Sequence, residues 1–258
     1  MCRPKGSLPH LRFYIWKVRS WLAKRLPQRK RWRNQKVSDA ELLALHLARI
    51  HFKHPYASVW WSLMRQLYPH LPSYTQAYVR LLRLRGALSG LACRQRRHRL
   101  VLVDSQPLAV CRWRRTKQCA CAGAAEGYGT HGSVYGFKLH AFVSCRGEVL
   151  AYRLRPANQH DYRVAKGMLE HLELGSPLKV GDKAYTSKEF ITPPKKNAKR
   201  PDNRWKPEYH RLRRRVETVF AQLAQAHIRN SQVSTFIALE ARVALTLLAH
   251  NLNLWLNP

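Results

Sequence analysis

Apolar residues within the first hundred positions recur at intervals of three and four, which is the period of an α-helix. The pattern predicts one helix from Ser38, an N-cap residue, to Ile50 and a second helix over residues 59–67. A third helix is predicted from Ser73 to about Gly86, after a short proline-containing turn. Two helices joined in this way, the second one basic, are typical of a helix-turn-helix reader of the DNA major groove. An ordinary basic helical bundle that touches only phosphates is the alternative.

The pattern changes after about residue 98, where a period of two replaces the helical period. An apolar run over residues 100–103 predicts a short buried strand that ends at Asp104, and the segments 137–144 and 149–154 predict two more strands joined by a turn. The remaining predicted elements are a helix over 161–174, a strand over 177–180 and two long helices over 206–227 and 235–256. We therefore expect a basic helical DNA-binding region, residues 1–97, and a mixed α/β domain, residues 98–258.

Composition adds a strong constraint on the partner. The 258 residues include 47 Lys and Arg against 14 Asp and Glu, a formal net charge of +33, and no carboxylate lies between Leu42 and Val103. The abundant cellular polyanion that neutralises such a charge is nucleic acid. The longest apolar stretch, residues 236–256, is interrupted by charged and amide side chains, so we expect no membrane span. The expected setting is the cytoplasm.

Positive side chains gather in several segments that we expect to contact DNA phosphates. A basic arm lies over residues 24–36, the third predicted helix carries three arginines, and a basic loop spans residues 195–204. Trp113, which lies among arginines, is a candidate for stacking on an unpaired base. The expected DNA-binding residues are Arg25, Arg29, Lys30, Arg31, Arg33, Arg80, Arg83, Arg85, Arg112, Arg114, Arg115, Lys195, Lys196 and Arg214.

Six cysteines are present, and a candidate zinc site is formed by four residues that lie close in sequence: Cys111, Cys119, Cys121 and His131. The usual structural pair is separated by about two to four residues, whereas a single residue separates Cys119 from Cys121. Reduced thiols in a cytosolic protein are the alternative.

Carboxylates are scarce in this sequence. Because a carboxylate near DNA repels the phosphates unless it binds a cation, the position of each one is informative. Asp104 follows the first predicted strand, Asp182 follows the strand over 177–180, and Glu217 borders the apolar stripe of the helix over 206–227. Ligand sites in α/β sheets lie at the carboxyl ends of strands. Three such carboxylates can hold two Mg²⁺ or Mn²⁺ ions, which activate an attacking hydroxyl and stabilise the leaving oxygen at phosphorus. By spacing alone, turn residues at the two aspartates and a surface ion pair at Glu217 remain the alternative.

Six ordered motifs make the sequence resemble a known family. They are Asp104–Cys111, Tyr135–His140, Pro156–Asp161, Gly181–Tyr185, Thr192–Asn197 and Val216–Phe220. Together they resemble the bacterial insertion-sequence transposases with a DDE catalytic domain, most closely the insertion sequence 982 family, over roughly residues 38–256. The resemblance implies a ribonuclease-H-like α/β core, divalent-metal chemistry, and Asp104, Asp182 and Glu217 as the metal-binding catalytic triad. It also implies that the substrate is double-stranded DNA carrying the element's terminal inverted repeats.

The sequence departs from the family pattern at three positions. Ala184 stands where the family usually has Gly, and Ala224 stands where related transposases often carry Lys. Tyr209 lies one place off the usual spacing, whereas Arg213, one turn before Glu217, fits it. The extended signature around the glutamate is therefore incomplete.

Four residues are candidates for accessory roles. Lys138 and His140 project from the same face of their predicted strand and either contact the scissile phosphate or simply face outward. Asp161 matches a family motif and is a candidate accessory acid, or else a helix N-terminal residue favoured by the dipole. Arg213 is the fourth.

These features predict a DNA transposase that cuts the element's ends by metal-dependent hydrolysis and joins the freed 3′-hydroxyls to target DNA. A homodimer is expected, with one protomer at each end of the element. Two alternatives stay open: a metal-dependent nuclease of the same fold without strand transfer, and a non-catalytic DNA-binding derivative.

Overall fold

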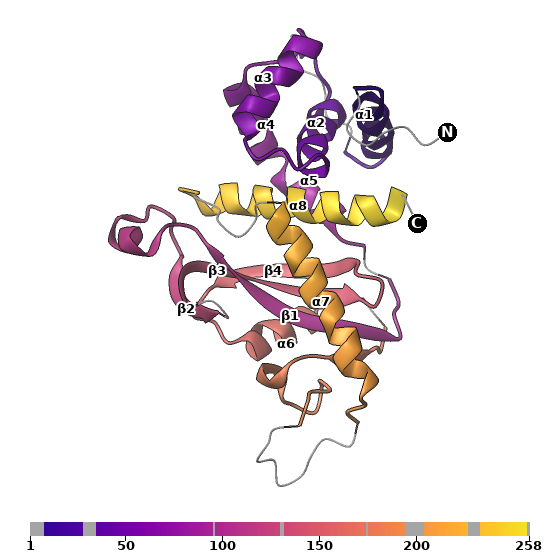
Figure 1. The fold of residues 1–258 in the computed structure, drawn as a ribbon, viewed down its shortest axis with the longest axis vertical. Coiled ribbons are helices and arrows are strands. Elements are labelled where there is room, and N and C mark those ends of the chain that lie inside the picture. The colour runs from indigo at the N-terminus through magenta and orange to yellow at the C-terminus, as the bar shows by residue number, and fades with distance from the viewer. Residues whose placement is uncertain are drawn as a thin grey trace. The chain divides into compact units, whose positions relative to one another are not determined.

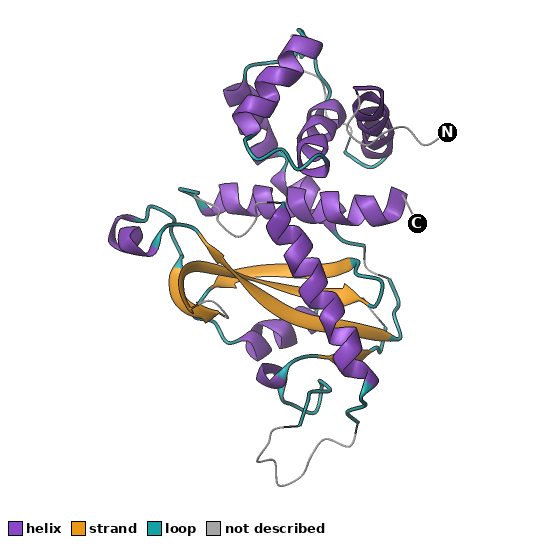
Figure 2. Ribbon diagram, in the orientation of Figure 1, coloured by secondary structure: helices purple, strands orange, loops and turns teal. Residues whose placement is uncertain are grey.

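The computed structural model describes residues 8–27, 35–94, 96–129, 132–173, 175–194, 204–226 and 233–256. The chain divides into two compact units, shown in Figure 1 and, by secondary structure, in Figure 2. The first unit contains Met1–Ala92 together with Glu240–Pro258, and the second contains Cys93–Leu239. The segment that follows the second unit therefore groups with the N-terminal helices, whereas the division expected from sequence, residues 1–97 and 98–258, assigns it to the α/β domain.

The first unit is entirely helical among the residues that the structure describes. The three helices predicted from periodicity are confirmed, whereas the first and fifth helices were not predicted. The helices are α1 (Leu8–Ala23), α2 (Asp39–His51), α3 (Ala57–Leu67), α4 (Tyr74–Arg83), α5 (Arg85–Ala92) and the part of α8 (Phe236–Leu256) from Glu240 onward.

Local side-chain bonds fix where these helices begin. The Ser38 hydroxyl accepts a hydrogen bond from the Glu41 amide at 3.1 Å, which caps α2. Ser73 and Gln76 form a capping box at the start of α4. Helix α2 is the centre of the unit, because nearly all of its side chains are buried. Asn251 of α8 donates to the Ala92 carbonyl at 2.8 Å, which ties α8 to the end of α5.

The second unit is built on a five-stranded mixed sheet. Strand β1 pairs antiparallel with β3 on one side and parallel with β5 on the other, while β2 and β4 pair with the remaining edge of β3. The strands are β1 (Leu100–Ala109), β2 (Ala125–Gly129), β3 (Gly132–Ser144), β4 (Val149–Pro156) and β5 (Leu178–Val180). With helices packed on the sheet, this is the ribonuclease-H-like α/β fold that the sequence predicts.

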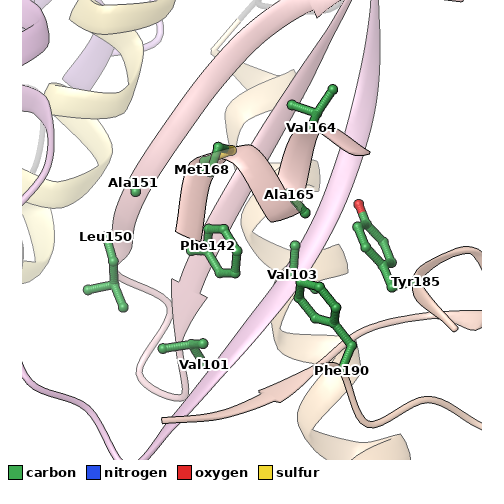
Figure 3. Packing of buried hydrophobic residues seen from close by; sticks show 10 residues of the cluster. All are labelled: Val101, Val103, Phe142, Leu150, Ala151, Val164, Ala165, Met168, Tyr185 and Phe190. Atoms are coloured by element: carbon green, nitrogen blue, oxygen red, sulfur yellow. The ribbon is translucent and has the colours of Figure 1, made fainter. Parts of the chain in front are cut away.

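Helices cover both faces of this sheet. On one face Val101, Val103 and Phe142 pack with Ala165 of α6 (Asp161–Leu169) in the main hydrophobic cluster, shown in Figure 3. On the other face α7 (Glu208–Gln225) lies along β1. Because successive side chains of a strand alternate between faces, Leu102 and Asp104 point to the side of α7.

Several predicted elements have different bounds in the structure. Strand β1 does not end at Val103 but continues to Ala109, so Asp104 lies in the middle of a strand. Strand β2 and a short 3-10 helix, η1 (Trp113–Gln118), were not predicted. Helix α6 ends at Leu169, five residues earlier than expected. No helix among the described residues has the length and apolar character needed to cross a membrane.

Candidate active site

Two aspartates lie side by side on neighbouring strands. Leu102 of β1 pairs in parallel with Val180 of β5, and each aspartate follows its strand partner by two residues. Asp104 and Asp182 are therefore at the same level of the sheet, and their side chains point to the same face, the one that α7 covers. The structure thus brings together two of the three residues that the sequence predicts for the triad.

The carboxyl group of Asp104 is partly buried. Burial is the largest cause of a pKa raised to about 7, and the nearby carboxyls of Asp182 and Asp161 raise it further. The Ser105 amide, which donates to Asp104 Oδ1 at 2.8 Å, and the Arg213 guanidinium act in the opposite direction. Partly buried carboxylates that repel one another are stabilised by a bound cation, so the electrostatics of this cluster suit a divalent metal ion.

Asp182 has a structural role in its own loop. Its Oδ1 accepts a hydrogen bond from the Ala184 amide at 2.8 Å and so caps a short 3-10 helix, η2 (Lys183–Tyr185). This bond needs only a backbone N–H at position 184, which explains why Ala184 is compatible with a motif that usually has Gly there. The second carboxylate oxygen of Asp182 accepts no bond in this cap.

Glu217 lies on α7, whose buried stripe packs toward the sheet. Val216, Val219, Phe220 and Leu223 are buried as predicted, whereas Glu217 is exposed. Arg213, one turn earlier, is close enough to Asp104 to lower its pKa, so this part of α7 passes beside the aspartates. Among the described residues, however, no three His, Cys, Asp or Glu side chains form a group that could hold a metal ion. The role of Glu217 stays a prediction.

Lys138, His140 and Asp161 form a partly buried network on the opposite face of the sheet. Lys138 Nζ donates to Asp161 Oδ1 at 3.0 Å, and His140 Nδ1 lies 3.9 Å from the same oxygen. His140 pairs in register with Ser105 rather than with Asp104, so its side chain points toward α6. Burial lowers the pKa of His140 to about 4, against the influence of Asp161. The accessory roles of Lys138, His140 and Asp161 stay predictions.

Tyr185 is a member of this region that the sequence reasoning missed. Its side chain is buried in the main cluster beside Phe190 (Figure 3). Burial raises the pKa of its phenol, and the carboxyls of Asp104, Asp161 and Asp182 raise it further. The tyrosine therefore lies among all three aspartates. Its position at the end of the Gly181–Tyr185 motif was the available signal.

The predicted DNA-binding residues fall into three groups. Some make intramolecular contacts: Arg25 lies 4.4 Å over the Trp21 ring, Arg80 donates to Asp39 at 2.6 Å, and Arg85 lies 3.7 Å from Glu240. Others are exposed, namely Arg83, Arg112, Arg114, Arg115 and Arg214. The remaining six lie outside the described residues: Arg29, Lys30, Arg31, Arg33, Lys195 and Lys196.

The candidate zinc site is only partly described. Cys111 lies near Cys119 and Cys121. Its pKa is raised to about 11, mainly by burial and further by these two neighbouring thiols. His131 lies outside the described residues, and the described cysteines form no three-residue group suited to a metal ion. The described thiols form no disulfide, and the zinc site stays a prediction.

The fold and the paired aspartates place the protein among the ribonuclease-H-like α/β proteins. A family model described as the transposase DDE domain matches residues 95–252, which is more than half of the chain. The chain therefore belongs to the DDE transposase family, and membership implies DNA as its partner. No curated protein matches the chain, and no solved structure matches it.

Proposed function

We propose that this transposase belongs to the insertion sequence 982 group and acts on the terminal inverted repeats of its own element. It cleaves the phosphodiester bond at each end and joins the freed 3′-hydroxyl to target DNA. The observation that carries the proposal is the pair of adjacent aspartates, one of them partly buried with a raised pKa, in a chain with a net charge of +33. Two adjacent carboxylates repel a polyanionic partner, and a bound cation removes that repulsion.

The residues present fit a site for two Mg²⁺ or Mn²⁺ ions held by Asp104, Asp182 and Glu217. The fit rests on burial and like charge at Asp104, and on oxygen ligands of the type that these hard cations prefer. Bound there, the ions supply Lewis-acid activation of the attacking oxygen and stabilisation of the leaving oxygen. Glu217 belongs to the site in this proposal because α7 already lies along β1, with Arg213 beside Asp104.

The protein's own residues position the DNA. The helical first unit and the exposed arginines neutralise phosphates, and this binding falls steeply with salt concentration. Arg213 holds a positive charge beside the aspartates, where the scissile phosphate is placed. Two protomers act together, one at each element end, so that the two cuts are coupled. We place this activity in the bacterial cytoplasm, at the nucleoid.

The experiment that tests the proposal uses DNA that carries both ends of the flanking element. The purified chain is incubated with Mg²⁺, with a chelator, and as the Asp104→Asn and Glu217→Gln variants. We expect cleavage at the element boundary that requires metal and is lost in both variants. Glu208→Gln is the matched control, because it removes the same charge from another exposed position of α7.

The products decide between the possible activities. Boundary cleavage followed by joining into a target plasmid supports a transposase, whereas cleavage without joining identifies a nuclease of the same fold. Tight binding without any metal-dependent product, or Glu217→Gln activity equal to that of Glu208→Gln, overturns the proposed chemistry.

A further inference from the structure

The segment that connects β1 to β2 carries a pocket that the proposed cleavage chemistry does not use. The pocket has a volume of about 430 Å³, and its polar lining includes Arg112, Arg115 and Gln118. Val110 and Val233 are among its apolar lining residues. All of these residues belong to the second unit. A site of this size lies within the range of about 300–1,000 Å³ that is typical of small-molecule pockets.

The helical geometry of η1 explains why these three polar side chains meet. A 3-10 helix repeats every three residues, so positions 112, 115 and 118 lie above one another on a single face. That face lines the pocket, and it presents two guanidinium groups and one amide. Trp113 lies on another face of η1, where 49% of its surface is exposed.

The charge of the pocket selects an anionic ligand. The sequence contains no carboxylate between Asp104 and Glu126, whereas η1 and its N-cap contribute Arg112, Arg114, Arg115 and Lys117. Among the residues that the structure describes, no carboxylate forms an ion pair with either arginine that lines the pocket. Two unpaired guanidinium groups three residues apart suit a phosphate, which arginine binds in a bidentate manner.

The other lining residues indicate that the ligand contains a further group besides a phosphate. A phosphate group alone leaves most of the volume unfilled. The flat face of a nucleobase can pack against apolar side chains and stack on the plane of an arginine guanidinium group. The edge of the base carries hydrogen-bond donors and acceptors that can pair with the Gln118 amide. A paired base cannot enter such a pocket, because its partner strand and its stacked neighbours occupy both sides of it.

We propose that this pocket binds a single unpaired nucleotide of the DNA that the transposase cuts. The proposal rests on the proposed function for the identity of the DNA. Asp104 lies five residues before Ala109, the last residue of β1, which corresponds to about 17 Å along the strand. This length equals about five steps of a DNA strand, so the captured nucleotide lies close to the cleavage site. Binding of this nucleotide then couples the unpairing of bases near the cleavage site to the positioning of the DNA.

The test compares two labelled duplexes of equal length and phosphate count, one fully paired and one with mismatched bases at its end. Binding of the full-length chain is measured in chelator, so that no cleavage occurs. We expect wild type to bind the mismatched duplex about tenfold more tightly than the paired one. The Arg112→Ala/Arg115→Ala variant is expected to lose this ratio, with the two duplexes binding equally. Lys117→Ala, which removes one charge from η1 outside the pocket, is expected to keep it.

Because the readout is a ratio within each variant, general loss of charge or of folded protein cancels. A ratio near one for wild type, or an unchanged ratio in the arginine variant, overturns the proposal. The Asp104→Asn variant is expected to keep the ratio, so a failure of the cleavage chemistry leaves this result interpretable on its own.

A second measurement on wild type identifies the ligand class. Cys111 lines the pocket, whereas Cys145 is exposed elsewhere in the second unit and serves as an internal control. Deoxynucleoside monophosphate is expected to slow maleimide labelling of Cys111 but not of Cys145, and inorganic phosphate at the same concentration is expected to slow neither. Equal protection by phosphate, or no protection by the nucleotide, contradicts a nucleotide site.

Discussion

His46, at the centre of the helical first unit, makes that unit sensitive to acid. The imidazole is buried in α2 and stacks on Trp61, with ring centroids 5.0 Å apart. Burial lowers its pKa to about 3, and the positive charge of Arg49 lowers it further. The Nε2 atom has no hydrogen-bond partner among the described residues. The folded unit therefore accepts only the neutral ring.

The direction and size of the effect follow from linkage. The pKa in the unfolded chain is about 6.5 and the folded value lies below it, so the unfolded state binds the proton more tightly. The full stability is present above pH 6.5 and is lost as the pH falls toward 3. Each pH unit in this window is worth about 1.4 kcal/mol, so by pH 4.5 the unit loses about 2.7 kcal/mol.

Urea unfolding followed by tryptophan fluorescence measures this loss, because Trp61 reports directly on the ring beside it. We expect wild type to lose stability between pH 6.5 and 4.5, and both His46→Leu and His46→Gln to show a much flatter dependence. The two replacements differ in polarity but neither titrates. If both variants lose as much stability as wild type over this range, the buried histidine is not the cause.

Other substitutions test the packing of the second unit and of α5. Phe142→Ala, in the middle of the main cluster, should lower the free energy of unfolding by about 3–5 kcal/mol in urea melts, and a loss below about 1 kcal/mol contradicts the described core. Gly127→Ala should prevent normal pairing of β2, because its Cβ would lie 2.3 Å from a backbone carbonyl. Gly90→Ala, with open space around its Cβ inside α5, should instead stabilise the protein by about 0.5–1 kcal/mol, and thermal melts of both glycine variants check the contrast. Lys138→Met should cost about 1–3 kcal/mol by leaving Asp161 without its ion pair, and an unchanged melting temperature counts against that pair.

The periodic parts of the fold were accessible from sequence because their signals are local. Helices α2 and α4 carry both the apolar period and a capping serine, and strands β3 and β4 alternate on either side of a turn. Helix α1 was missed because exposed apolar residues such as Phe13 and Trp16 obscure the period of its buried stripe, which is formed by Tyr14, Ile15, Val18 and Leu22.

Strand β1 shows why local signals were insufficient elsewhere. Asp104, Ser105 and Gln106 interrupt its apolar run, and Pro107 removes a backbone donor. The strand continues because β3 pairs with it as far as Ala109, whereas β5 pairs only with its first three residues. The proline is tolerated where β1 has no second strand to bond in the described structure.

In the candidate site too, some residues could be predicted from the sequence and others could not. Asp104 and Asp182 were accessible because scarce acids next to strands are conspicuous in a basic chain. The ion pair between Lys138 and Asp161 joins residues 23 positions apart, and the burial of Tyr185 among three aspartates depends on how α6 packs on the sheet. Such neighbours are set by tertiary packing, and no spacing in the sequence encodes them.

The grouping of Glu240–Pro258 with the N-terminal helices has a consequence for synthesis on the ribosome. The second unit, Cys93–Leu239, is inserted within the helical unit, so all of its residues emerge before the helical unit can be completed. Hydrogen bonds such as those from Asn251 to Ala92 and from Lys17 to Leu256 form only when α8 has been translated. A nascent chain thus carries the complete second unit before the helical unit is finished, and a premature stop before α8 leaves the helical unit without its closing element.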